Sequence, residues 1–176
     1  SVASYADPFE NVPNLVRPNL LDNWYFVGGG SQQGVGQFPI NSIGQTTYTA
    51  KGPVIDGWTK PTSDYTVELL STGLQITGTR TANLMIAQKI PLSLDGKTVP
   101  LSVLHSGGLA SGTFTVQNGQ PAMSTFTAYL NRESDGFLFG LKSNASTGDS
   151  VTYVIYAIKM EVGSDQTLFH FENGTR

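Results

Sequence analysis

The stretch VTYVIYAIKM, residues 151–160, decides the fold class of this chain. β-Branched and aromatic residues dominate it, and alternate positions of an extended strand fall on opposite faces. One face carries Val151, Tyr153, Ile155, Ala157 and Lys159, and the other carries Thr152, Val154, Tyr156, Ile158 and Met160. Both faces are mostly apolar, which predicts a strand in the interior of a sheet.

Similar strand-like runs recur along the chain between Gly, Asn, Asp, Ser and Pro residues, whereas helical periodicity is almost absent. We expect strands at residues 24–28, 45–50, 54–60, 65–70, 73–78, 84–90, 98–105, 112–117, 123–130, 136–142 and 151–163. The dipeptides Asp95-Gly96 and Asn118-Gly119 favour tight hairpins. So many short strands in 176 residues predict one all-β domain of two packed antiparallel sheets.

The first 18 residues differ from the rest of the chain. Pro8, Pro13 and Pro18 recur there with polar neighbours and no periodicity, which predicts an extended arm over residues 1–18 and a domain over residues 19–176. The arm cannot bury its apolar side chains against itself. We therefore expect Tyr5, Phe9 and Leu15 of the arm to pack on another surface.

Composition makes several partners poor candidates. Charged residues are 13% of the chain, the net charge is −3, and no basic cluster is present, so neither nucleic acid nor an anionic membrane is an expected partner. Residues 151–160, the longest apolar run, are too short to insert across a bilayer. The chain has no cysteine, which removes disulfides and thiolate chemistry.

The sequence shows no catalytic constellation. It has two histidines and no H-E-x-x-H or G-x-S-x-G motif. His105 ends an apolar strand and is interpreted as a capped or core-edge histidine, while the adjacent Ser106 points to the opposite face. The carboxylates are interpreted as a solvated surface, the alternative being a pair that flanks a glycosidic bond. We expect a non-enzyme.

The glycine-rich segment GGGSQQGVGQ, residues 28–37, fails both nucleotide-binding patterns because it lacks the P-loop lysine and the third glycine of the dinucleotide motif. It does supply amides at Gln32, Gln33 and Gln37, and carbohydrate binding requires such polar groups beside exposed aromatic rings. Trp58, next to a turn, is either such a ring or a core residue. The loop NRESDG, residues 131–136, offers Arg132 and is either a second binding loop or a charged hairpin tip.

Three phrases carry a resemblance to a known family: PNLLDNWYFVGGGSQQGVGQFPIN at residues 18–41, VIDGWTK at 54–60 and AIKMEVGSDQTLFHFENG at 157–174. They resemble the N-L-L-x-N-x-x-F, I-D-x-W and A-K-L-E-x-G…S-x-x-T-L phrases of carbohydrate-binding jelly rolls in bacteriophage tail-fibre, baseplate and head-fibre proteins. The chain departs conservatively at Met160, where leucine is usual, and at its end, where relatives often continue with a tryptophan-containing tail.

The resemblance implies a jelly-roll sandwich in which the opening and closing phrases lie side by side. It also implies a location on the outside of the virion, a homotrimer, attachment to other virion proteins through the arm, and binding of a host-surface glycan. The alternatives are a capsid decoration or head fibre that binds no glycan, and a carbohydrate-binding module of a glycoside hydrolase.

The resemblance further implies a structural Ca²⁺, which such sugar-binding modules often hold between their first and last strands. Asp22, Asp56 and Glu161 lie in the matching phrases, and calcium prefers oxygen ligands. The alternative is that these three carboxylates are surface groups or strand-end caps.

Overall fold

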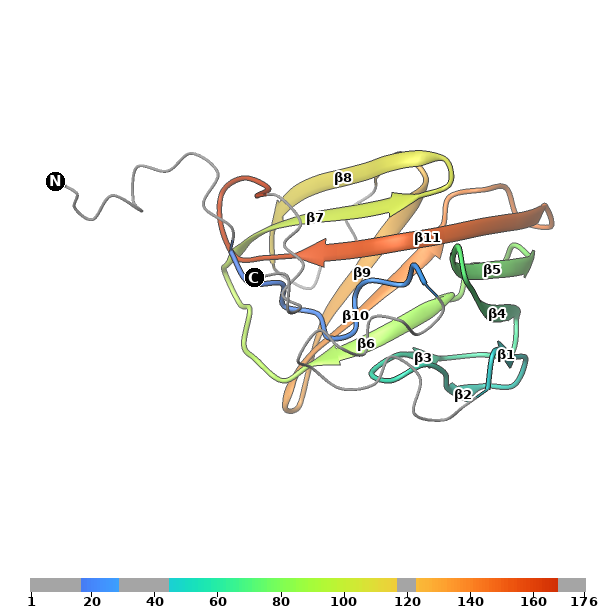
Figure 1. Cartoon of the computed structure of the whole chain (residues 1–176). Coiled ribbons are helices and arrows are strands. Elements are labelled where there is room, and N and C mark those ends of the chain that lie inside the picture. Colours follow the sequence, from blue (N-terminus) through green and yellow to red (C-terminus); the bar gives the residue numbers. More distant parts are fainter. Residues whose placement is uncertain (1–16, 29–44, 117–122, 168–176) are drawn as a thin grey trace, which may run out of the picture.

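A computed structural model describes residues 17–28, 45–116 and 123–167, and these form a sandwich of two antiparallel sheets (Figure 1). Every regular element in these ranges is a strand, as the sequence predicted. Within the same ranges, no helix is long and apolar enough to cross a membrane.

The first sheet has six strands, in the order β1-β4-β5-β11-β7-β8. Their bounds are Thr47–Tyr48, Tyr65–Leu70, Gly73–Thr79, Ser150–Met160, Thr98–His105 and Gly108–Thr115. The long strand β11 lies between β5 and β7, which confirms the interior position predicted from its two apolar faces.

The second sheet has five strands, in the order β2-β3-β6-β10-β9. Their bounds are Gly52–Pro53, Thr59–Lys60, Ile86–Ile90, Gly136–Ser143 and Phe126–Glu133. The chain passes repeatedly from one sheet to the other, and in Figure 1 β9 and β10 cross behind β7, β8 and β11.

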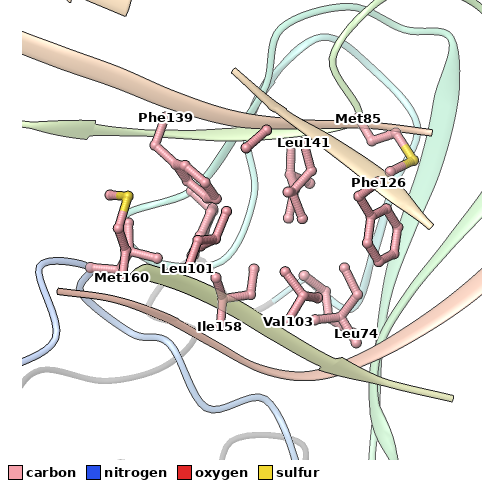
Figure 2. Packing of buried hydrophobic residues seen from close by; sticks show 14 of the residues in the cluster. Leu74, Met85, Leu101, Val103, Phe126, Phe139, Leu141, Ile158 and Met160 are labelled. Carbon is pink, nitrogen blue, oxygen red and sulfur yellow. The ribbon is translucent and has the colours of Figure 1, made fainter. Parts of the chain in front are cut away.

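The core lies between the two sheets, where each strand points alternate side chains inward. Phe126, Phe139 and Leu141 come from the five-stranded sheet and face Leu101 and Val103 of the six-stranded sheet (Figure 2). All of these side chains are buried. Removal of this apolar area from water is the main stabilising term of the fold.

Several predicted strands differ from the observed ones; residues 45–50, for example, keep only Thr47–Tyr48 as a strand. Residues 54–58 form a turn, closed by hydrogen bonds from Val54 N to Trp58 O (3.0 Å) and from Trp58 N to Ile55 O (2.9 Å). Gly57 adopts a φ of +87°, so the Asp-Gly dipeptide ends the extended run and only Thr59–Lys60 remains as a strand. Residues 24–28 make a single isolated bridge, Tyr25 to Ala157, rather than a strand.

One predicted hairpin is also wrong. Gly96 has the positive φ expected of it (+71°), and Lys97 N donates to Leu94 O at 3.0 Å. The turn connects β6 to β7, however, and these strands belong to different sheets, so it is a crossover. Asn118-Gly119 lies outside the described residues.

Residues 20–26 extend the six-stranded sheet. Strand β5 pairs with β11 as far as Ile155, and beyond that point the opening segment takes its place beside β11 (Figure 1). Hydrogen bonds run from Leu20 N to Met160 O (2.7 Å) and from Phe26 N to Tyr156 O (2.9 Å). The prediction that the opening and closing phrases lie side by side is therefore confirmed.

Strand β11 contains one extra residue where its partner changes. Ile155 is opposite His105 and Ala157 is opposite Leu104, so Tyr156 is a one-residue β-bulge. The bulge keeps Ile155 and Ile158 in the core.

Candidate functional site

The predicted carbohydrate-binding residues have different positions. Gln32, Gln33 and Gln37 lie outside the described residues. Trp58 is 2% exposed, and its indole nitrogen donates to Asn23 O at 2.9 Å. Its ring packs edge-on against Phe26 and Phe139 at centroid separations of 5.8 and 6.2 Å. A ring buried in this way cannot stack on a sugar, so Trp58 as a binding platform is corrected to a core residue.

Arg132 is exposed, but it is engaged with Asp95. Its guanidinium donates to the Asp95 carboxylate at 2.6 and 3.1 Å, and this pairing raises the pKa of Arg132 above its ordinary value. Arg132 thus connects the β9–β10 hairpin to the turn that precedes β7.

At the same hairpin, Lys89 pairs with Asp135 and lies 3.9 Å from Glu133. The hydrogen bond between Lys89 and Asp135 raises the pKa of the lysine and lowers that of the carboxyl. Residues 131–136 are therefore a charged hairpin tip, one of the two structures that the sequence left open.

The three carboxylates predicted to bind calcium do not converge in the described part of the chain. There, no group of three or more His, Cys, Asp or Glu side chains could hold a metal ion. Asp22 contacts Gln88 through its backbone, and the Asp56 carbonyl accepts from Asn23 Nδ2 at 2.9 Å. Glu161 lies elsewhere in the network described next.

Glu161 is fully buried at the end of β11, in a group that we call the terminal network: Arg17, Lys159, Glu161, Gln166 and Thr167. Its Oε1 accepts from Thr167 Oγ1 (2.7 Å), and its Oε2 accepts from Thr167 N (2.9 Å) and Gln166 Nε2 (2.6 Å). Arg17 donates to Oε1 at 3.4 Å. With so many donors around both oxygens, Glu161 acts as a structural cap.

Lys159 completes this network. It is 1% exposed, its ammonium donates to Thr167 Oγ1 at 2.8 Å, and it lies 3.9 Å from Glu161. Burial is the largest effect on this lysine and lowers its pKa. Arg17 also donates to Asp165 O at 2.8 Å. The last residues of the predicted arm are thus bound to the domain.

His105 is buried at the end of β7, which agrees with its interpretation as a core-edge histidine. Its Nδ1 accepts from Gly107 N at 3.1 Å, and its ring lies edge-on to Phe126 at 5.0 Å. Burial lowers its pKa. Ser106 Oγ accepts from Val154 N at 3.2 Å, so the hydroxyl joins the β7–β8 turn to the backbone of β11.

The outer face of the five-stranded sheet carries a group that the sequence analysis missed, which we call the Tyr129 face: Thr127, Tyr129, Asn131, Gly140 and Lys142. Tyr129 is directly opposite Gly140, and Lys142 is opposite Thr127. The intervening residues Ala128, Leu130 and Leu141 are buried in the core, so the alternation of the strands points this group outward.

The Tyr129 face combines a ring, an amide and a cation. The Lys142 ammonium lies 5.7 Å from the centroid of the partly exposed Tyr129 ring. Asn131 Nδ2 donates to Tyr129 Oη at 2.7 Å, while Asn131 Oδ1 is buried without a hydrogen-bond partner among the described residues. If the amide oxygen and nitrogen of Asn131 were exchanged, Tyr129 Oη would donate to the oxygen and the nitrogen would be left unpaired instead, because Tyr129 Oη contacts only one end of the amide. One polar atom of this amide is therefore left without a hydrogen bond among the described residues.

The signal for this face was present in the sequence. In FTAYL, residues 126–130, Phe126, Ala128 and Leu130 alternate with Thr127 and Tyr129, which places a tyrosine on the solvent side of a strand. No protein-family model and no curated protein matches this chain.

Proposed function

We propose that this chain is a non-catalytic module on the exterior of a phage virion, and that it binds host-surface carbohydrate at the Tyr129 face. The observation that carries the binding proposal is the partly exposed Tyr129 ring beside Asn131, whose buried side-chain oxygen has no partner in the part of the chain that the structure describes. A glycan supplies both an apolar C–H face and hydroxyl donors, which this pair of side chains requires.

Each side chain has a separate role in this proposal. The Tyr129 ring stacks on one sugar, and Lys142 donates to its hydroxyls from the neighbouring strand. Asn131 Oδ1 is covered, so a sugar hydroxyl satisfies it only after the amide turns outward; leaving such an acceptor unpaired costs about 1–3 kcal/mol, which favours that movement. Gly140 adds no side chain directly opposite the ring, and Leu84 covers it there, with methyl carbons 2.8 and 2.9 Å from the place that a Cβ would take.

The virion part of the proposal is supported by the resemblance of the opening and closing phrases to phage fibre modules. The arm joins the module to the particle, and a homotrimer lets each arm pack on a neighbouring copy. The hydrogen bonds of Arg17 to Glu161 and Asp165 fix the point at which the arm leaves the domain, and the arm attaches the module from that point.

The test is binding of the full chain to an array of bacterial surface glycans, followed by calorimetry on the best ligand. We expect Tyr129→Ala to weaken binding by at least about tenfold, the effect of losing about 1.4 kcal/mol. The control is Tyr156→Ala, which removes a partly exposed tyrosine from the other sheet and should leave the affinity unchanged. Wild-type protein that binds no glycan, or a Tyr129→Ala variant that binds normally, would contradict the proposal.

A second candidate function is a capsid decoration or head fibre that binds no glycan. The fixed position of Arg17 favours it, because a rigid exit point suits a structural attachment. Full-length protein would then copurify with capsids, and a chain that lacks residues 1–16 would not.

A further inference from the structure

The four sheet edges in the described part of the chain differ in their protection. The outermost strands are β1 and β8 in one sheet, and β2 and β9 in the other. Strands β1 and β2 have two residues each, and β9 ends in the charged pair Arg132 and Glu133. Short length and charge are two devices that prevent edge-to-edge pairing.

Strand β8 has neither device. Its eight residues, GLASGTFT, include no charged residue and no proline, and its ladder with β7 runs from Thr98↔Thr115 to His105↔Gly108 without a shift in register. In Figure 1 it forms the outer margin of the six-stranded sheet. It is therefore a long, regular and uncharged edge, which favours addition of another strand.

The hydrogen bonds of β7 show which residues of β8 face this edge. The carbonyls of Thr98 and Pro100 accept from Gly163 N (2.9 Å) and Glu161 N (3.2 Å), on the side away from β8. Their partners Thr115 and Thr113 are thus in non-hydrogen-bonded pairs, and their own backbone groups point to the edge that no described strand pairs with. Because the pattern repeats every two residues, the backbone groups of Ser111 and Leu109 point there too.

An apolar row on the outer face leads to the same edge. Tyr25, Ala157, Leu104 and Leu109 follow one another in register across four neighbouring segments of the sheet. Leu104 is 38% exposed and Leu109 is 59% exposed, and they are two of the four exposed large hydrophobic residues in the described ranges. The row ends on an exposed leucine at the last strand, where a further strand would cover it.

We infer that β8 pairs with β8 of a second copy, antiparallel and about a two-fold axis, so that two six-stranded sheets become continuous. The register that uses the whole edge places Leu109 opposite Thr115 and Ser111 opposite Thr113. A second copy fits because the edge is neutral: identical strands meet without like-charge repulsion, and hydroxyl side chains face each other across the pair. The contact is independent of glycan binding, and it would join two trimers if the arm also forms a three-fold contact.

The experiment measures the mass of the full chain by light scattering at roughly 10 to 100 micromolar, where weak self-association becomes visible. In the variant Thr113→Lys, two ammonium groups would meet near the two-fold axis. In Thr113→Pro, the N–H that faces the edge is lost while the bonds to β7 remain. We expect either variant to have the mass of the assembly that the arm alone forms, which is half the wild-type mass when the β8 pair closes a two-fold symmetric particle.

The matched control is Thr77→Lys, which places the same charge on the outer face of the interior strand β5 and should keep the wild-type mass. Circular dichroism checks that each variant is folded. Equal masses for wild type and both Thr113 variants would overturn the inference, and so would a halved mass in Thr77→Lys.

Discussion

Glu161 and Lys159 are oppositely charged residues that are almost completely buried at one end of β11. Removing both charges from water is costly, and the hydrogen bonds of the terminal network offset that cost. The network joins both ends of the described domain, since Arg17 precedes the first core residue and Thr167 follows the last strand.

Glu161→Gln should therefore be strongly destabilising, because it leaves Lys159 buried without its counter-charge. We expect a loss of about 3–5 kcal/mol in the free energy of unfolding, measured with urea. The control Glu133→Gln removes an exposed carboxylate next to Lys89 and should cost less than about 1 kcal/mol. Equal losses of unfolding free energy in the two variants would show that the buried terminal network stabilises the domain no more than an exposed ion pair does.

The buried His105 predicts a pH dependence. Burial lowers its folded-state pKa below the ordinary value of 6.5, so the unfolded chain binds the proton more readily. Stability should then be fully present above pH 6.5 and decrease as the pH falls through the lower folded-state pKa. The measurement is the urea midpoint between pH 7.5 and pH 5, in wild type and in His105→Asn, in which Oδ1 can still accept from Gly107 N. A variant with the same pH profile as wild type would refute this assignment.

At the scale of the elements, the β9–β10 hairpin depends on Gly136. This glycine has a φ of +148°, and a Cβ there would lie 3.0 Å from Pro91 Cα and in still closer contact with Ile90 O. Gly96 also has a positive φ (+71°), but a Cβ there would meet nothing within 4 Å. A substitution at Gly96 thus tests backbone strain alone, whereas a substitution at Gly136 tests backbone strain together with steric overlap.

Gly136→Ala should cost more than about 3 kcal/mol, because strain and overlap add. Gly96→Ala should cost about 1–2 kcal/mol from the left-handed backbone alone. Thermal unfolding of both variants measures the difference. Similar values would mean that the hairpin moves to accommodate the methyl group.

The strands that the sequence predicted well are those with a long period-two pattern. The bounds of β4 and β7 agree with the predicted residues 65–70 and 98–105. Residues 24–28 are rich in aromatic residues for a different reason: Phe26 enters the core while the segment bonds only part of β11. A propensity pattern cannot distinguish a paired strand from an extended segment that fills a gap.

The candidate site was harder to predict than the fold. Trp58 has the same neighbours in sequence whether its turn faces solvent or the core, and packing against Phe26 and Phe139 decides the outcome. The outward position of Tyr129 could have been derived from strand alternation. Its proximity to Lys142 depends on the register between β9 and β10, which no single strand encodes.

At the scale of the whole molecule, the opening segment connects the two sheets. Residues 20–26 bond to β11 of the six-stranded sheet, and the backbone N–H of Asp22 donates to Gln88 of the five-stranded sheet at 2.7 Å. Trp58 lies where these parts meet, with Phe26 on one side and Phe139 on the other. Neither sheet can therefore separate without exposing this segment.

We expect the domain to unfold in one cooperative step. Tryptophan fluorescence reports on Trp24 of the opening segment and on the buried Trp58, and far-UV circular dichroism reports on both sheets, so their urea transitions should coincide. A fluorescence midpoint at lower urea would indicate that the opening segment detaches first. The control is the same comparison for Phe26→Leu, which should move both midpoints together.

The bulge at Tyr156 makes β11 unequally sensitive to changes in chain length. A strand that loses one residue normally exchanges its two faces from that point onward, which would turn Lys159 inward and Ile158 outward. Deletion of Tyr156 itself would leave Ile155 and Ala157 as consecutive, correctly alternating residues, at the cost of the bond from Phe26 N. A one-residue deletion elsewhere in β11 would exchange the inward and outward faces of every residue between the deletion and the bulge, or between the deletion and the end of the strand. Natural length variation within β11 should therefore be concentrated at Tyr156.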